Sequence, residues 1–187
     1  MKRFLPALVC LLFAACGDTP PAPVAEPTAT ASPVATSGVR EDCSSNAGGA
    51  SFPGAFTNPE NLVVGPLVIV AGAYVDRDAP RLLGRERFLV LVMAGHTVTV
   101  RLAPEARTLA GLAYGRHRNG KVKLRDTSHS VTFAACGAED STSDVDGADA
   151  TLWSGYVLTR RPECIPLEVA IDGGAPQRVG LTLGARC

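Results

Sequence analysis

Short segments in which hydrophobic and polar residues alternate are the feature that most constrains the fold of this chain. In residues 96–102 (HTVTVRL) valine and leucine alternate with threonine and arginine, and residues 130–135 (SVTFAA) repeat the pattern. A period of two residues places the apolar side chains on one face of a β-strand. Further segments with strand character occupy residues 61–64, 67–75, 87–93, 108–114, 121–125, 150–158, 164–171 and 178–184.

Glycine, proline and aspartate separate these segments, and no segment longer than about ten residues keeps a helical period with caps. Many short strands without helices are typical of sandwiches and barrels. We therefore expect an all-β domain, an immunoglobulin-like Greek-key β-sandwich of about nine or ten strands. The continuous apolar run at residues 88–93 (FLVLVM) suits a central strand that is covered on both faces.

The last two segments predict a hairpin. Pairing Val169 with Val179 keeps the apolar residues of both strands on one face and leaves residues 172–176 (DGGAP) as the connection. In this register Cys164 lies opposite Gly184.

The expected domain contains four cysteines: Cys43, Cys136, Cys164 and Cys187. An even number outside the cytoplasm favours two disulfides, for which three connectivities exist. Zinc is the competing interpretation, but no C-x-x-C occurs and the wide spacing differs from that of structural zinc sites. We prefer Cys43–Cys136 and Cys164–Cys187, and the second pair requires the chain to bend at residues 184–185. Such a bond stabilises the fold by roughly 3 kcal/mol.

The N-terminus has the three parts of an export signal. Lys2 and Arg3 precede an apolar run at residues 4–13, which is followed by Ala14 and Ala15. The run is too short to span a bilayer, which needs about 20 residues. We therefore predict that residues 1–15, which include Cys10, form a signal peptide that is removed.

The sequence FAAC at residues 13–16 resembles the lipobox of bacterial lipoproteins, with Phe13 where leucine is usual. The resemblance implies that Cys16 carries a lipid and that the membrane is a partner through this anchor. The alternative is ordinary cleavage that leaves Cys16 as a free thiol. Residues 16–40 are rich in proline, alanine and threonine, which predicts a disordered linker. Residues 41–187 remain as the β-sandwich domain, outside the cytoplasm at the cell membrane.

Overall charge excludes one class of partner. The chain has 18 basic and 18 acidic residues, and loss of Lys2 and Arg3 with the signal leaves 16 basic ones. A nearly neutral chain has no global field that attracts nucleic acid.

The segment YGRHRNGKVKLRD at residues 114–126 suggests an anion site. Asn119-Gly120 is a strong two-residue hairpin signal, and a turn there places one tyrosine and five cations on one face: Tyr114, Arg116, Arg118, Lys121, Lys123 and Arg125. Like charges across a strand pair repel, so a compensating anion is expected. The candidates are a wall polymer, lipid head groups or an acidic protein. The alternative is a solvated edge on which cations prevent unwanted strand pairing.

Five acidic residues lie in residues 139–149. The sequence DVDGAD within this segment resembles a calcium loop superficially, but its glycine is misplaced and no glutamate follows at the twelfth position. We expect a mobile acidic loop here, and calcium is the alternative.

Catalytic motifs are missing from the sequence. The three histidines, His96, His117 and His129, have no metal-binding spacing, and Ser154 lacks the glycine pattern of a nucleophile elbow. We therefore expect no catalytic residues, no metal and no cofactor.

The C-terminal part resembles an uncharacterised group of exported or lipid-anchored proteins of GC-rich Gram-positive bacteria. The shared pattern consists of VTFAAC at residues 131–136, WSGYVL at 153–158, CIPLEVAIDG at 164–173 and GARC at 184–187. The resemblance implies an exported all-β fold with disulfides, and it implies no activity.

Together these observations favour a non-catalytic binding or interaction module at the cell envelope. The alternatives are a hydrolase that acts on wall material and a purely structural envelope protein.

Overall fold

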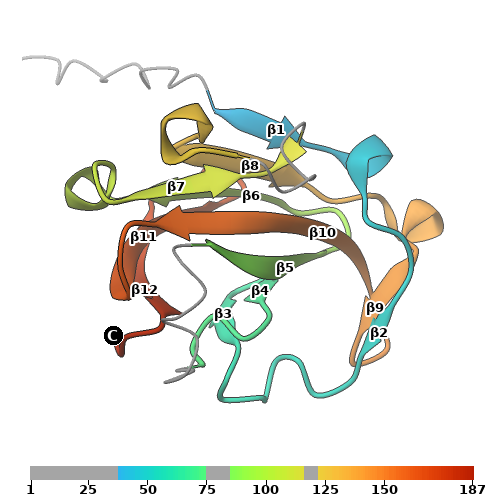
Figure 1. The fold of residues 1–187 in the computed structure, drawn as a ribbon. Coiled ribbons are helices and arrows are strands. Elements are labelled where there is room, and N and C mark those ends of the chain that lie inside the picture. Colours follow the sequence, from blue (N-terminus) through green and yellow to red (C-terminus); the bar gives the residue numbers. More distant parts are fainter. Residues whose placement is uncertain (1–37, 75–84, 116–121) are drawn as a thin grey trace, which may run out of the picture. The chain divides into compact units, whose positions relative to one another are not determined.

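A computed structural model describes residues 38–74, 85–115 and 122–187, without the side chains of residues 85 and 86. The predicted signal peptide, Cys16 and nearly all of the predicted linker lie outside these residues. Twelve strands form in the described part (Figure 1): β1 Val39–Glu41, β2 Ser51–Phe52, β3 Leu62–Val64, β4 Leu67–Ile69, β5 Arg85–Met93, β6 Thr97–Leu102, β7 Ala110–Ala113, β8 Ser130–Ala134, β9 Ser143–Val145, β10 Ala148–Thr159, β11 Glu163–Ile171 and β12 Gln177–Leu183. Four short 3-10 helices accompany them: η1 Cys43–Ser45, η3 Pro104–Ala106, η5 Leu124–Asp126 and η6 Ala138–Asp140.

The strands form two sheets. The first has the order β1-β8-β6-β11-β12, and the second has the order β2-β9-β10-β5-β4-β3, with β7 paired to the end of β10. The predicted all-β fold with two sheets and two disulfides is confirmed. The immunoglobulin-like Greek-key order is not confirmed by this strand order. Within the described ranges no helix is long and apolar enough to cross a bilayer.

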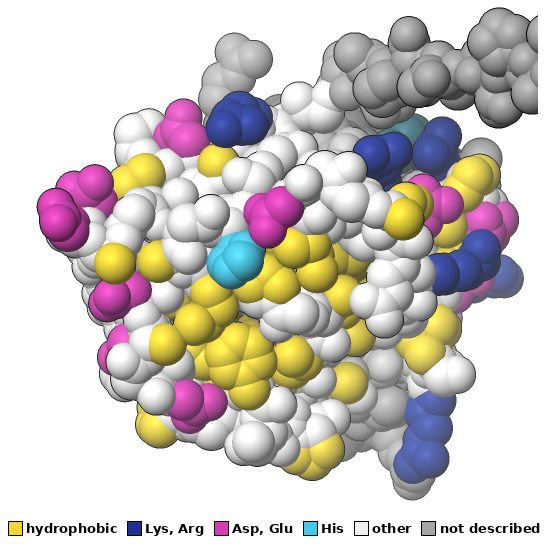
Figure 2. Space-filling view, turned by 180° about the vertical axis from the view of Figure 1, so that it is seen from behind, with side chains coloured by type: hydrophobic (Ala, Val, Ile, Leu, Met, Phe, Trp, Pro, Cys, Tyr) yellow, Lys and Arg dark blue, Asp and Glu magenta, His cyan; other side chains and the backbone are white. Residues whose placement is uncertain are grey.

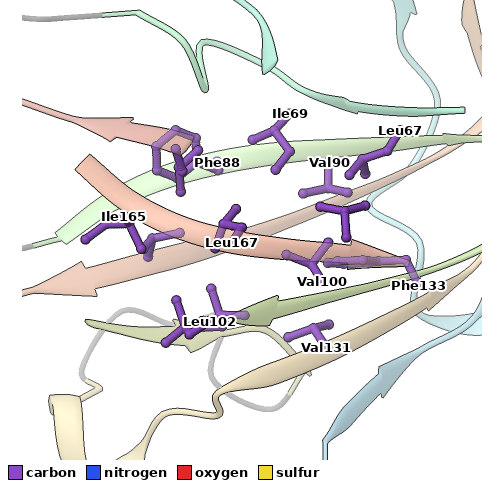
Figure 3. Close-up of a cluster of buried hydrophobic side chains, with 14 of the residues drawn as sticks. Leu67, Ile69, Phe88, Val90, Val100, Leu102, Val131, Phe133, Ile165 and Leu167 are labelled. Atoms are coloured by element: carbon purple, nitrogen blue, oxygen red, sulfur yellow. The ribbon is translucent and has the colours of Figure 1, made fainter. Parts of the chain in front are cut away.

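The main core lies between the two sheets (Figure 3). Phe88 and Val90 of β5 point toward Val100 of β6 and Leu167 of β11, and all four side chains are buried. Their alternation with polar residues in β6 and β11 is what the sequence pattern predicts, because each polar neighbour faces away from the core.

Strand β5 is covered on both faces, as its continuous apolar sequence predicts. Phe88 and Val90 face the main core, whereas Leu91 belongs to a second buried cluster on the other face. Phe52 and Phe56 pack against that second cluster. The segment around β2 therefore covers part of the outer face of the second sheet.

The register predicted for the last hairpin is wrong by two residues. Val169 pairs with Gln177, and Cys164 lies opposite Thr182. A shift by two leaves every side chain on its predicted face, so hydrophobic patterning does not distinguish the two registers. Strand β11 pairs with β12 as far as Val169, whereas its pairing with β6 on the other side continues to Ile171.

One N-terminal segment supplies an edge strand of each sheet. Strand β1 pairs in parallel with β8 of the first sheet, and β2 pairs in parallel with β9 of the second. These edge strands are only three and two residues long, and short edge strands limit edge-to-edge aggregation.

Candidate functional site

The N-terminal corner consists of the Cys43–Cys136 disulfide together with Glu41, Ser45 and Trp153. The Cα atoms of the disulfide lie 4.8 Å apart, and Cys136 is 2% exposed. The backbone N–H of Cys136 also donates to the hydroxyl of Thr151, which is itself buried. This bond therefore belongs to the interior of the domain.

A polar network accompanies this disulfide. The indole Nε1 of Trp153 donates to Ser45 Oγ and to the carbonyl of Asp42, both at 3.2 Å. Ser45 Oγ donates to the carboxylate of Glu41 at 2.5 Å, and Glu41 is buried. Buried polar groups need such partners, so the network fixes the N-terminal segment on β10.

Tyr114 belongs to this corner, which corrects its predicted place on a cationic surface. Its ring is buried, and it packs edge-on against Phe133 at 5.1 Å between centroids. The absence of a side chain at Gly155 makes room, because a Cβ there would lie 2.4 Å from the ring. Burial, and secondarily the charge of Glu41, raises the pKa of the Tyr114 phenol far above its usual value of about 10.

The predicted cationic hairpin is only partly within the described residues. Lys123 and Arg125 are exposed, which both the anion site and the solvated edge predict, and Arg125 lies 3.7 Å from the carboxylate of Asp126. Arg116, Arg118, Lys121 and His117 lie outside the described residues. The predicted strand at residues 121–125 is wrong where it is described, because residues 124–126 form η5. The predicted turn at Asn119-Gly120 would place Leu112 opposite Thr127, whereas the observed bridge joins Leu112 to Ser128.

The acidic segment forms a hairpin where a mobile loop was expected. Strands β9 and β10 meet at Asp146 and Gly147, whose φ values are 56° and 82°. Two positive φ angles are what a type I′ hairpin turn requires, and an Asp-Gly pair is its usual sequence. Asp146 accepts a hydrogen bond from the N–H of Gly54, and Asp144 accepts one from Ser51. In the described part of the chain, no three His, Cys, Asp or Glu side chains are arranged to hold a metal ion.

His96 and Asp172 form an exposed pair that the sequence did not suggest. Nδ1 of His96 lies 2.8 Å from Asp172, whose other carboxylate oxygen accepts the N–H of Thr97 at 2.8 Å. These bonds, the one from Thr97 first, lower the pKa of Asp172. Asp172 has a positive φ of 49° in the β11–β12 connection, and the pair ties that connection to the β5–β6 turn.

The C-terminal corner consists of the Cys164–Cys187 disulfide and an open groove of about 550 Å³ beside it. The groove is lined by residues 59–60, 73–74, 180, 182 and 186–187. The N–H of Thr182 donates to the carbonyl of Gly72 at 2.9 Å, which joins the edge strand β12 to the chain that follows β4. The groove therefore lies where the two sheets meet. Sequence reasoning missed it, because its residues are far apart in the chain.

Basic and acidic side chains separate toward opposite ends of β10. The hairpin at its start carries Asp144, Asp146 and Asp149, and the exposed Arg160 and Arg161 follow its last residue. A strand of twelve residues spans about 36 Å. In Figure 2 most acidic side chains lie along the left margin, and most lysine and arginine side chains lie toward the right.

Other exposed cations lie near Arg160 and Arg161. Strand β11 begins after these arginines, and Leu183 of β12 pairs with Glu163 at its start, so Arg186 lies at the same end. Lys123 and Arg125 lie toward this end too, because η5 contacts β7, which pairs with the last four residues of β10. We call Arg160, Arg161 and Arg186 the arginine end.

Both predicted disulfides are confirmed, and such bonds are typical of an oxidising environment outside the cytoplasm. Comparisons of this chain with protein families, with curated proteins and with solved structures found no match.

Proposed function

We propose that this chain is a lipid-anchored, extracytoplasmic, non-catalytic module that binds an anionic component of the cell envelope. The lipid on Cys16 holds the protein at the membrane, and residues 16–40 act as a spacer. The folded domain presents the arginine end to a wall polymer or an acidic protein partner.

The observation that carries this proposal is the separation of charge along β10. The chain is neutral overall, yet Arg160, Arg161 and Arg186 are exposed at the end opposite the acidic hairpin. A local group of cations attracts an anion even when the net charge is zero, and salt weakens the attraction. Only Arg161 of these three pairs with a described carboxylate, that of Glu163 at 3.3 Å.

Retention on an immobilised polyanion tests the binding. Heparin and purified teichoic acid are suitable matrices, and the eluting salt concentration is the readout. We expect the variant Arg160→Ser/Arg161→Ser/Arg186→Ser to elute at lower salt than the wild type. A second variant, Arg116→Ser/Arg118→Ser/Lys121→Ser/Lys123→Ser, tests the predicted hairpin in the same way.

Arg40→Ser is the matched control, because Arg40 is an exposed arginine on β1. Retention equal to that of the wild type in both multiple variants contradicts the proposal. Release of new reducing ends from the polymer contradicts the non-catalytic role. For the anchor, Cys16→Ala is expected to move the chain from the membrane fraction to the soluble extracytoplasmic fraction.

A further inference from the structure

We propose that the groove of the C-terminal corner binds a saccharide that carries a carboxylate. In this site Tyr74 stacks on the sugar ring and Arg186 binds the carboxylate. The inference rests on the proposed binding function and names the ligand class and the site within it.

The groove has the dimensions of a ligand site. Its volume of about 550 Å³ falls within the range of about 300–1,000 Å³ that is typical of small-molecule sites. Its lining is mainly apolar, with contributions from Pro59, Ala73 and Gly180, and a few polar groups converge on it. A sugar ring matches such a surface, because it has apolar C–H faces and a polar rim.

Tyr74 supplies a stacking surface. Its side chain is 45% exposed, and it is the large hydrophobic residue that stands out as exposed among the described residues. Because Tyr74 lines the groove, its ring offers an apolar face and a hydroxyl to a ligand bound there. The backbone that carries it is fixed, since Ala73 N–H donates to the carbonyl of Glu60 at 2.8 Å and Tyr74 N–H to that of Ala71 at 3.1 Å.

Arg186 supplies the charge, and the disulfide fixes its place. Cys187 is bonded to Cys164 and lies directly against Gly180, where a Cβ would come within 2.6 Å of the Cys187 sulfur. The covalent bond thus holds the residue next to Arg186 on the groove wall, which lowers the entropy lost when a ligand binds. Arg186 is exposed and has no ion pair with a described carboxylate. A guanidinium binds a carboxylate through two parallel hydrogen bonds.

Glu60 narrows the ligand class. Glu60 also lines the groove. A carboxylate at this position repels a ligand with several negative charges and accepts hydrogen bonds from hydroxyl or amide groups. Within an anionic polymer, the groove therefore fits one sugar unit that carries a single carboxylate together with hydroxyl and amide groups, whereas Arg160 and Arg161 lie outside the groove lining.

Two sugars that differ by one carboxylate provide the test. N-acetylmuramic acid carries a lactyl carboxylate that N-acetylglucosamine lacks. Each is titrated into the ¹⁵N-labelled protein, and amide shifts are followed at residues 60, 73–74 and 180–187. We expect millimolar binding of N-acetylmuramic acid at these residues and about tenfold weaker binding of N-acetylglucosamine. Equal affinity for the two sugars, no shifts in the groove, or shifts confined to other surfaces overturn the inference.

Variants assign the two roles. Arg186→Gln is expected to weaken N-acetylmuramic acid about tenfold and to leave N-acetylglucosamine unchanged. Tyr74→Ser is expected to weaken both sugars, whereas Tyr74→Phe keeps the ring and restores binding. Arg40→Gln, which changes an exposed arginine of β1 outside both the groove lining and the arginine end, is the matched control and should change neither.

Failure of the inference is distinguishable from failure of the proposed function. Salt-dependent retention on a polyanion without groove shifts on adding N-acetylmuramic acid overturns the saccharide site and leaves the anionic binding function standing. If the wild type is not retained on the polyanion and N-acetylmuramic acid causes no amide shifts in the groove, both the proposed function and the saccharide site are overturned. If Arg186→Gln and Arg40→Gln lower sugar affinity equally, Arg186 acts through general charge, and the assigned carboxylate contact is wrong.

Discussion

The N-terminal and C-terminal corners each contain one disulfide, and the two bonds have different surroundings. Cys136 is buried beside Thr151, and the network of Trp153, Ser45 and Glu41 lies next to the bond. Cys187, by contrast, is exposed at the rim of an open groove. The difference indicates that the Cys43–Cys136 disulfide is part of the packed interior, whereas the Cys164–Cys187 disulfide holds the chain that lines the groove.

Loop length sharpens the comparison. The N-terminal disulfide joins residues 93 apart, and the C-terminal disulfide joins residues 23 apart. In the chain-entropy account, the longer loop gives the larger stabilisation of the folded state. The first bond therefore has the larger part in stability, and the second is expected to matter more for binding.

The largest expected effect comes from Cys43→Ser/Cys136→Ser. This variant should lose about 4–5 kcal/mol of unfolding free energy, because the unfolded chain regains the freedom of the long loop. Urea unfolding followed by the fluorescence of Trp153, the single tryptophan of the chain, measures the loss. A smaller loss than in the C-terminal disulfide variant would contradict the assigned roles.

Cys164→Ser/Cys187→Ser should cost about 3 kcal/mol in the same assay. Because the tail that carries Arg186 is then released, discrimination between N-acetylmuramic acid and N-acetylglucosamine should disappear. The native fluorescence of Trp153 should stay unchanged, since the N-terminal corner is intact. Retained discrimination would show that the bond does not position Arg186.

Within the N-terminal corner, Ser45→Ala removes the hydroxyl between Trp153 and the buried Glu41. We expect a loss of about 1–3 kcal/mol, because buried polar groups lose a partner. Ser44→Ala is the control, since the exposed Ser44 bonds to the exposed Asp42. Equal losses in the two variants would mean that the hydroxyl of Ser45 adds no more stability than the exposed hydrogen bond of Ser44 to Asp42.

Among these variants, Tyr114→Phe is expected to change the free energy of unfolding least at neutral pH. At alkaline pH the wild type and the variant should differ in how steeply that free energy falls. The pKa of the Tyr114 phenol is raised in the folded state. Its contribution to stability is therefore complete below the unfolded pKa of about 10, and it is lost as pH rises toward the folded value. Thermal unfolding from about pH 8 to pH 11 should show a steeper loss in the wild type than in the variant. An equally steep loss of stability in the wild type and in the variant would show that Tyr114 does not cause the loss at alkaline pH.

Much of the fold could be predicted because side-chain direction in a strand is a local property. The segments that became β5, β6, β8, β10, β11 and β12 alternate, or are apolar throughout, over five or more residues. Strands β1, β2 and β9 are two or three residues long, too short for a period to be visible. The register of β11 and β12 was wrong for a different reason, since a shift by two residues buries the same faces.

The candidate sites depend on contacts that local patterns do not contain. Tyr114 looked like part of a cationic ladder, but the room for its ring is supplied by Gly155 of another strand. Tyr74 and Arg186 come together only through the pairing of β12 with the chain after β4 and through a disulfide. The cysteine count predicted that bond, and the groove beside it became visible only in three dimensions.

The attachment of β1 to β8 determines how the domain responds to mechanical load. A pull on the chain ahead of Val39 first loads the three residue pairs of β1. Just beyond β1, Cys43 passes the force through a covalent bond to Cys136. We therefore expect tension at this end to detach the short strand β1 before it loads β2 and the remaining strands of both sheets.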